Sequence, residues 1–200
     1  MRRSGRKVFA IVLGAAVFAV GRASAQDALA RAMDLEQAGR FAEAAEVYRA
    51  LLVAVPTDIA ALLGAERTYA LAGRRDSTAA LARRALAADS TNRIFHIVLL
   101  RSLRALREES LATAAFERWV ALAPRDPSPY RELARLLIAE SRDSQARAVL
   151  VRGRTRLTDP TVGAAEMAQV EMHEAAYLRA AEEWRTAVAR ESAMREAAVY

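Results

Sequence analysis

Apolar and polar residues follow one another along the chain with the spacing of amphipathic helices. Ala28, Ala32 and Leu35 recur at i, i+4 and i+7, which places them on one side of a helix. Gly39 follows this stretch, where the end of a helix favours a left-handed residue. A second helical pattern begins directly afterwards. The sequence therefore predicts a pair of antiparallel helices joined by a short turn.

The breaks between helical stretches recur every 34 residues. The breaks that separate one pair from the next centre on Pro56, Ser90, Pro124 and Thr158. The breaks that we expect inside the pairs have the same period and fall at Gly39, Gly73, Arg107, Ser141 and Ala175. Polar residues that can cap the following helices are Asp58, Asn92, Asp126 and Asp159. A single period indicates a repeat protein, because one small hairpin buries its apolar side only by stacking on the next.

The distribution of small and large residues within each repeat resembles the tetratricopeptide-repeat (TPR) family. In this family a small residue recurs in the second helix and a large one follows four positions later. The small position falls on Ala44, Thr78, Ala112, Ala146 and Ala180. The large position falls on Tyr48, Ala82, Phe116, Leu150 and Trp184. The resemblance implies an all-α fold, an α-solenoid of stacked antiparallel hairpins in a right-handed superhelix, with the large residues in the core.

The large position of the first helix departs from this pattern in the last repeat, where it falls on Glu171. Val170 beside it can fill the slot after a small rotation. The array covers 26–192, in units of about 25–58, 59–92, 93–126, 127–160 and 161–192. Residues 193–200 are expected to start a further helix without a partner. This end favours truncation of a longer protein.

The N-terminus has the three parts of a secretory signal peptide. Residues 1–25 hold basic residues and no acid, and the apolar run Val8–Val20 is followed by Ala23-Ser24-Ala25. The apolar run is shorter than the roughly 20 residues of a membrane-spanning helix. We expect cleavage between Ala25 and Gln26 and export to the periplasm or cell envelope, with no membrane span in the mature chain. An uncleaved N-terminal anchor is the alternative.

The charge of the chain depends on this segment. The formal net charge is +6, from 30 basic and 24 acidic residues, and five of the basic residues lie in the first 25. The remaining chain is close to neutral, so its charge does not indicate nucleic-acid binding. The chain has no cysteine. This excludes a disulfide scaffold, a zinc-thiolate site and a cysteine nucleophile.

The sequence contains no recognisable catalytic or cofactor motif. His96 and His173 lie 77 residues apart and neither has a second ligand at i+4. His96 occupies a slot that we expect to be buried, and the aromatic residues fall at helix-packing positions. No phosphate-binding loop, dinucleotide fingerprint or nucleophile elbow occurs. We expect no catalysis, no metal and no cofactor.

A row of arginines marks the candidate binding surface. By resemblance, the first helix of each repeat lines the concave face, where TPR proteins bind peptides. Arg67, Arg101 and Arg135 are one period apart on these helices, Arg104 and Arg131 lie one turn away, and Leu63 and Ile97 are apolar neighbours. Guanidinium groups suit carboxylates, so the expected partner is a protein or peptide with an acidic segment. The alternative is pairing within the chain, with Glu66 and Glu132.

These observations predict a non-enzymatic protein-interaction scaffold of the periplasm or cell envelope. Two other interpretations remain open. In the first, the repeats form the N-terminal region of a larger envelope enzyme or sensor whose active domain lies beyond residue 200. In the second, the final helix pairs between chains and the protein self-associates.

Overall fold

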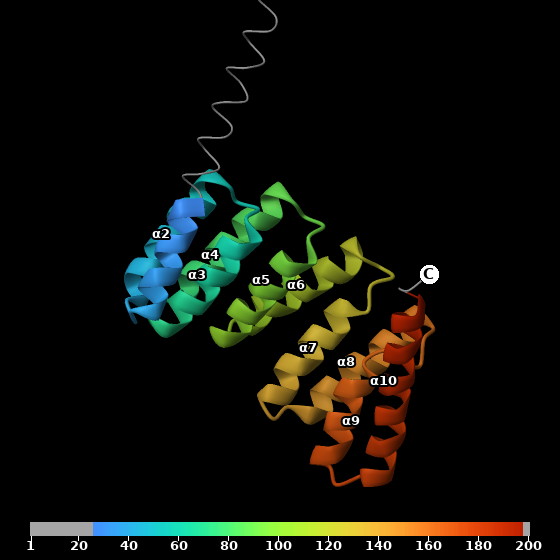
Figure 1. The fold of residues 1–200 in the computed structure, drawn as a ribbon. Coiled ribbons are helices and arrows are strands. Elements are labelled where there is room, and N and C mark those ends of the chain that lie inside the picture. Colours follow the sequence, from blue (N-terminus) through green and yellow to red (C-terminus); the bar gives the residue numbers. More distant parts are fainter. Residues whose placement is uncertain (1–25, 198–200) are drawn as a thin grey trace, which may run out of the picture. The chain divides into compact units, whose positions relative to one another are not determined.

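The structure, a computed structural model, describes residues 26–197, and these residues are helical with no strand among them (Figure 1). The first helix covers residues 26–37. The helices that follow are α2 (Phe41–Ala54), α3 (Ile59–Leu71), α4 (Arg75–Ala88), α5 (Arg93–Ala105), α6 (Glu109–Leu122), α7 (Ser128–Ala139), α8 (Asp143–Leu157), α9 (Ala164–His173) and α10 (Tyr177–Ala197). They form consecutive hairpins, as the sequence predicts. The expected signal peptide lies outside the described residues.

The turn inside each hairpin has the same backbone geometry. The residues with a left-handed backbone at these turns are Gly39 (φ 71°), Gly73 (74°), Arg107 (59°), Ser141 (58°) and Ala175 (56°). In each turn the amide of the next residue donates to the carbonyl five residues back, at 2.8 to 3.0 Å. This Schellman motif satisfies carbonyl groups at the end of the first helix. The breaks predicted inside the pairs are confirmed. At three of them, Arg107, Ser141 and Ala175, a residue other than glycine adopts the left-handed backbone conformation, which costs about 1 kcal/mol.

The turns between hairpins are closed by the polar residues expected there. Asp58 accepts a hydrogen bond from the amide of Ala61, and Asn92 accepts one from the amide of Ile94, both at 3.0 Å. The equivalent aspartates bond amides two residues later: Asp126 that of Ser128 and Asp159 that of Thr161. Asp58 and Asn92 therefore cap α3 and α5, as predicted. The prediction is wrong for Asp159, because its turn precedes α9, which begins only after Gly163 and has no side-chain cap.

The chain divides into two compact units, one ending at Ser90 and one beginning at Thr91. In the first unit the hairpin of residues 26–37 and α2 stacks on α3 and α4. Its core consists of Ala32, Leu35, Ala44, Ala45, Tyr48, Leu52, Ala61, Leu62, Ala65, Tyr69, Ala79, Ala82 and Ala85. Small residues dominate, so the helices approach closely around the two tyrosines. Gly64 on α3 faces the ring of Tyr48 with no room for a Cβ atom.

In the second unit the first helices of successive hairpins, α5, α7 and α9, contact one another in sequence. A buried apolar cluster joins the last two hairpins and contains Ala134, Leu137, Ala146, Leu150, Met167 and Val170. Val170 fills the slot that the sequence pattern assigns to Glu171, as expected. Glu171 is also buried, with its carboxylate bonded by Arg147 on α8 and Arg179 on α10. Two arginines therefore hold a charge that the core itself could not accommodate.

Two expectations about the last hairpin are wrong. The helix does not end near Ser192, because α10 continues to Ala197 as one helix of 21 residues. No proline, glycine or asparagine stands near 192 to stop it. Residues 193–197 therefore extend α10 instead of starting a further helix. Trp184 is not a core residue: it is 41% exposed, whereas the equivalent large residues of the earlier repeats are buried. In the described residues no following hairpin covers it.

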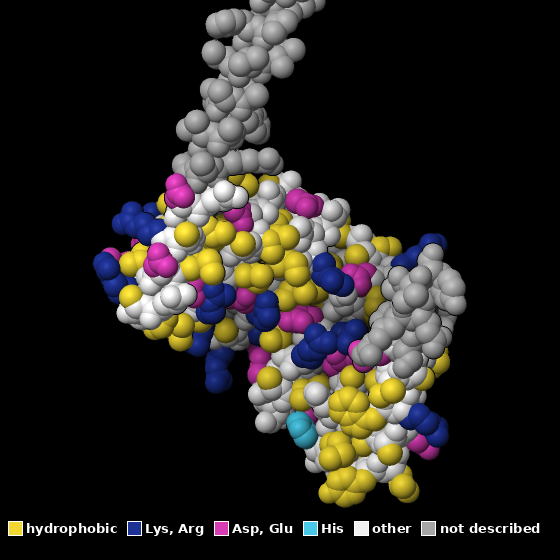
Figure 2. All heavy atoms as spheres, viewed as in Figure 1, with side chains coloured by type: hydrophobic (Ala, Val, Ile, Leu, Met, Phe, Trp, Pro, Cys, Tyr) yellow, Lys and Arg dark blue, Asp and Glu magenta, His cyan; other side chains and the backbone are white. Residues whose placement is uncertain are grey.

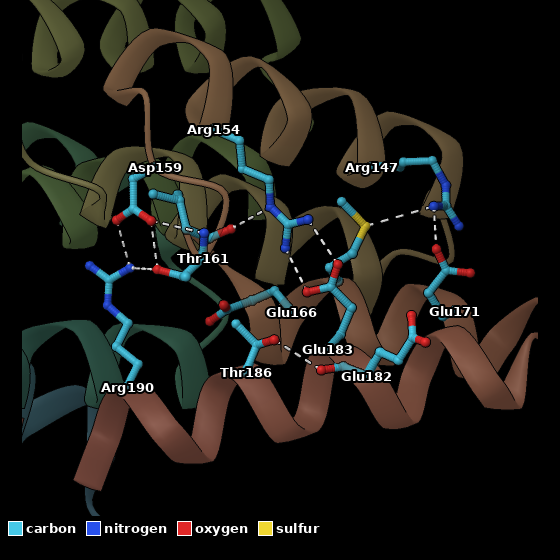
Figure 3. Close-up of polar contacts among 12 residues, drawn as sticks. Arg147, Arg154, Asp159, Thr161, Glu166, Glu171, Glu182, Glu183, Thr186 and Arg190 are labelled. Carbon is cyan, nitrogen blue, oxygen red and sulfur yellow. Dashed lines mark hydrogen bonds and ion pairs between the residues drawn. The ribbon is translucent and has the colours of Figure 1, made fainter. Parts of the chain in front are cut away.

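Polar contacts attach α10 to the preceding hairpin (Figure 3). Arg154 on α8 makes a two-pronged ion pair with Glu183, at 2.8 and 2.7 Å. Further along α10, Arg190 bonds Asp159 at 2.9 Å and also the hydroxyl of Thr161. Bidentate arginine–carboxylate pairs fix orientation as well as distance. They hold one side of α10 against α8 and the turn before α9.

We expect Gly64→Ala to destabilise the protein, because the added methyl group would overlap the Tyr48 ring. The free energy of unfolding should fall by about 1–3 kcal/mol, the usual cost of overpacking. On an exposed helix the same exchange stabilises by about 1 kcal/mol, so the sign of the change is diagnostic. Urea unfolding followed by circular dichroism measures it. A gain in stability would contradict the close approach of α2 and α3.

Candidate functional site

The arginines predicted to form a binding row lie on the first helices of their repeats, and each one is held by carboxylates of the chain. In the first unit, Arg67 on α3 donates two hydrogen bonds to Glu36 on the helix of residues 26–37, at 2.7 and 2.8 Å. The hydroxyl of Tyr48 donates to the same carboxylate. Leu63, the apolar neighbour on α3, is half-buried.

These contacts change the titration of the carboxylate and the phenol. The hydrogen bond from Arg67 lowers the pKa of Glu36, even though partial burial acts in the opposite direction. Burial, together with the hydrogen bond to Glu36, raises the pKa of Tyr48 to about 12. Glu36 is therefore ionised and Tyr48 neutral at neutral pH. This triad links the first two hairpins through their first helices.

In the second unit, five residues form a continuous row of alternating charge on α5, α7 and α9, which we call the ionic ladder. Its contacts run from Arg101 to Glu132 (4.0 Å), on to Arg135 (3.6 Å), from Arg135 to Glu166 (2.7 Å) and from Glu166 to Arg131 (3.1 Å). Glu132 and Glu166 are buried, whereas the arginine side chains are 40 to 52% exposed. The carboxylates form the floor of the ladder, and the arginine side chains above them are partly exposed, although the Nε atom of Arg101 is buried.

The ladder follows the repeat. Arg101 and Arg135 are one period apart, and so are Glu132 and Glu166, so each arginine bonds the carboxylate 31 residues later on the next first helix. The pairing with Glu132 that the sequence left open is present. The sequence analysis did not assign Glu36 or Glu166 to this surface. For Glu166 the available signal was its position one repeat period after Glu132.

Arg104 has a different environment from the rest of the row. Its side chain is 6% exposed and bonds Glu109 on α6 at 2.5 Å and Glu140, at the end of α7, at 3.0 Å. Arg142 bonds the same two carboxylates. Arg104 therefore connects two successive hairpins and offers little surface to a partner. Ile97, one helical turn before Arg101 on α5, is half-buried.

A cleft of about 390 Å³ lies at the end of the ladder, inside the second unit. Arg131 and Glu166 form one wall, and the turn at Thr161 and Gly163 and the α10 residues Ala187 and Arg190 form the others. In this cleft Arg131 bonds Glu166, and Arg190 bonds the hydroxyl of Thr161 as well as Asp159 outside the lining, as Figure 3 shows. The cleft extends the surface of the ladder towards α10.

The two histidines take part in packing and in a surface pair. His96 is buried and stacks on Trp119 with ring centres 5.2 Å apart. His173 contacts Asp143 at 3.0 Å on the surface. Among the side chains that the structure describes, no group of three or more His, Asp or Glu is arranged to hold a metal ion. The helices of this part of the chain include none with the length and hydropathy needed to cross a membrane.

Comparison with known proteins identifies the fold. No family model and no curated protein matches the sequence. Among solved structures, a TPR protein of Thermus thermophilus is 17% identical and aligns with a TM-score of 0.52 over 82% of this chain and 90% of that one. The chain has the TPR fold.

Two further structures support this assignment. PilF of Pseudomonas aeruginosa is 19% identical, with a TM-score of 0.52 over 83% of this chain and 76% of that one. A TPR protein of Parabacteroides merdae is 16% identical, with a TM-score of 0.53 over 81% of this chain and 63% of that one. At these identities the likeness concerns the arrangement of TPR hairpins and not the residues of the ladder.

We expect Glu36→Gln to lower the free energy of unfolding at neutral pH by about 1 kcal/mol, since Arg67 is half-exposed and the pair is partly screened. The pKa of Glu36 is lowered in the folded state, so its stabilising effect is full above the unfolded pKa of about 4.3 and disappears as the pH falls through the folded value. The variant and the wild type should therefore converge in acid. Urea unfolding at a series of pH values tests this.

The matched control is Asp34→Asn, on the same helix, where the carboxylate is exposed and the described residues offer it no ion pair. It should leave the pH dependence unchanged. A constant difference between Glu36→Gln and wild type at every pH would show that the carboxylate charge is not what stabilises this contact.

Proposed function

We propose that this chain is a non-enzymatic scaffold that binds an extended protein or peptide segment along the first helices of its repeats. The observation that carries the proposal is the ionic ladder, in which buried carboxylates hold half-exposed arginines in a row on α5, α7 and α9. In the TPR fold these helices line one face of the array. Surfaces of this kind suit protein recognition, because rigid display lowers the entropy lost on binding.

The charge of the ladder favours an acidic segment. It contains three arginines and two glutamates, so one positive charge is not compensated within it. Each guanidinium has five N–H donors in a fixed fork, and the bonds to Glu132 and Glu166 use only some of them. A carboxylate of a partner can accept from the donors that face solvent. Ile97 on α5 adds an apolar contact at the edge of the ladder.

We also propose that the scaffold acts outside the cytoplasm, in the periplasm or cell envelope. The basic start, the apolar run Val8–Val20 and the small residues Ala23 and Ala25 support this location. We expect the protein purified from the envelope fraction to begin at Gln26. Intact-mass measurement tests the cleavage, and a mass that includes residues 1–25 would contradict it.

Binding can be tested with a labelled peptide that alternates glutamate with leucine, measured by fluorescence anisotropy. We expect Arg101→Gln to weaken binding about tenfold, equivalent to about 1.4 kcal/mol. Arg101 is chosen because it lies one repeat before Arg135 and its 4.0 Å contact with Glu132 is the longest in the ladder. A peptide with lysine in place of glutamate should bind much more weakly.

The matched control is Arg152→Gln. Arg152 is 46% exposed and also pairs with a glutamate, but it lies on α8, a second helix. This variant should bind the acidic peptide as the wild type does. Equal weakening by both variants, or equal affinity for acidic and basic peptides, would contradict recognition by the ladder.

A further inference from the structure

The outer side of α10 carries an exposed apolar stripe. Tyr177, Ala181, Trp184 and Val188 are separated by four, three and four residues, which places them on one side of the helix. Tyr177, Trp184 and Val188 are 63, 41 and 61% exposed, and Leu178 next to them is 85% exposed. Figure 2 shows hydrophobic side chains gathered near the turn that joins α9 to α10. A contiguous patch of this kind marks an interaction surface.

The equivalent residues of earlier repeats show what normally covers the position of Trp184. Trp184 is equivalent to Tyr48 and Leu150, which are both buried. The following hairpin covers them: Gly64 on α3 lies against Tyr48, and Met167 and Val170 cluster with Leu150. Within residues 26–197 no helix does the same for Trp184. The position is shaped to receive a helix, because that is how each earlier repeat uses it.

The stripe is not needed to attach α10 to its own unit. Ala180 is buried against the unit, and Glu183 and Arg190 form the ion pairs with Arg154 and Asp159 seen in Figure 3. Glu183 and Arg190 are displaced from Trp184 by about 100° or more around the helix, so they lie on a different side of α10. Ala180 lies between that side and the stripe. The stripe is therefore available to a partner while α10 stays docked.

We infer that the partner is α10 of a second copy of this chain, in antiparallel orientation. A two-fold axis between residues 182 and 183 sets Tyr177 opposite the partner's Val188 and Ala181 opposite the partner's Trp184. Every layer then combines a large side chain with a smaller one. A parallel pair would set Trp184 against the partner's Trp184 and leave a gap at Ala181, and such uneven packing is unfavourable.

Because the interface is two-fold symmetric, each of these layers forms twice. α10 is thus complementary to itself in size.

The absence of cysteine from the chain makes the pairing directly testable. We expect the full chain with Tyr177→Cys and Val188→Cys to form a disulfide-linked dimer under mild oxidation, because cysteine meets cysteine across the axis. Each single variant should form no disulfide-linked dimer, since identical positions are about 16 Å apart along the helix. The matched control is Leu111→Cys with Leu122→Cys, two exposed positions on α6 with the same separation.

Three results would overturn the proposal: no disulfide-linked dimer from the double variant, as much disulfide-linked dimer from the α6 control, or disulfide-linked dimers from the single variants, which would indicate a parallel pair.

Discussion

The structure depends on one constraint: a hairpin of two short helices cannot bury its apolar side within itself. Each hairpin is covered by the next, and the contacts that do so repeat with the sequence. Tyr48 fits against the glycine of α3, and Leu150 fits against Met167 and Val170 of α9. Stability in such an array comes from neighbouring contacts that add along the chain. Trp184 occupies the same stacking position, but within the described residues no hairpin covers it, and it stays partly exposed.

Charge follows the same repeat as the apolar contacts. Arg101 and Arg135 each reach the carboxylate of the next first helix, so the ladder joins hairpins as well as facing solvent. A buried carboxylate such as Glu166 is stable only because arginines compensate it. The arginines are consequently fixed in place before any partner arrives. The proposed binding role therefore uses arginines whose positions the stacking of the hairpins already fixes.

Much of the fold could be predicted from the sequence, because the features that set it are local. The left-handed turn at Gly39 and the cap at Asp58 depend on neighbouring residues, and the period repeats them. The ladder was only partly predictable. Its arginines lie in register along the sequence, but the choice of Glu166 depends on how successive helices stack. The continuation of α10 past Ser192 was missed because the period, not a helix-breaking residue, suggested an end there.

If the first helices form the binding face, a bound partner must protect them and leave the second helices unchanged. Hydrogen exchange measured by mass spectrometry, with and without the acidic peptide, tests this most directly because it reports on each helix separately. We expect slower exchange in α5 and α7, which carry the ladder, and no change in α6 and α8. Protection confined to the second helices, or no protection anywhere at a peptide concentration that saturates binding, would contradict a binding face on the first helices.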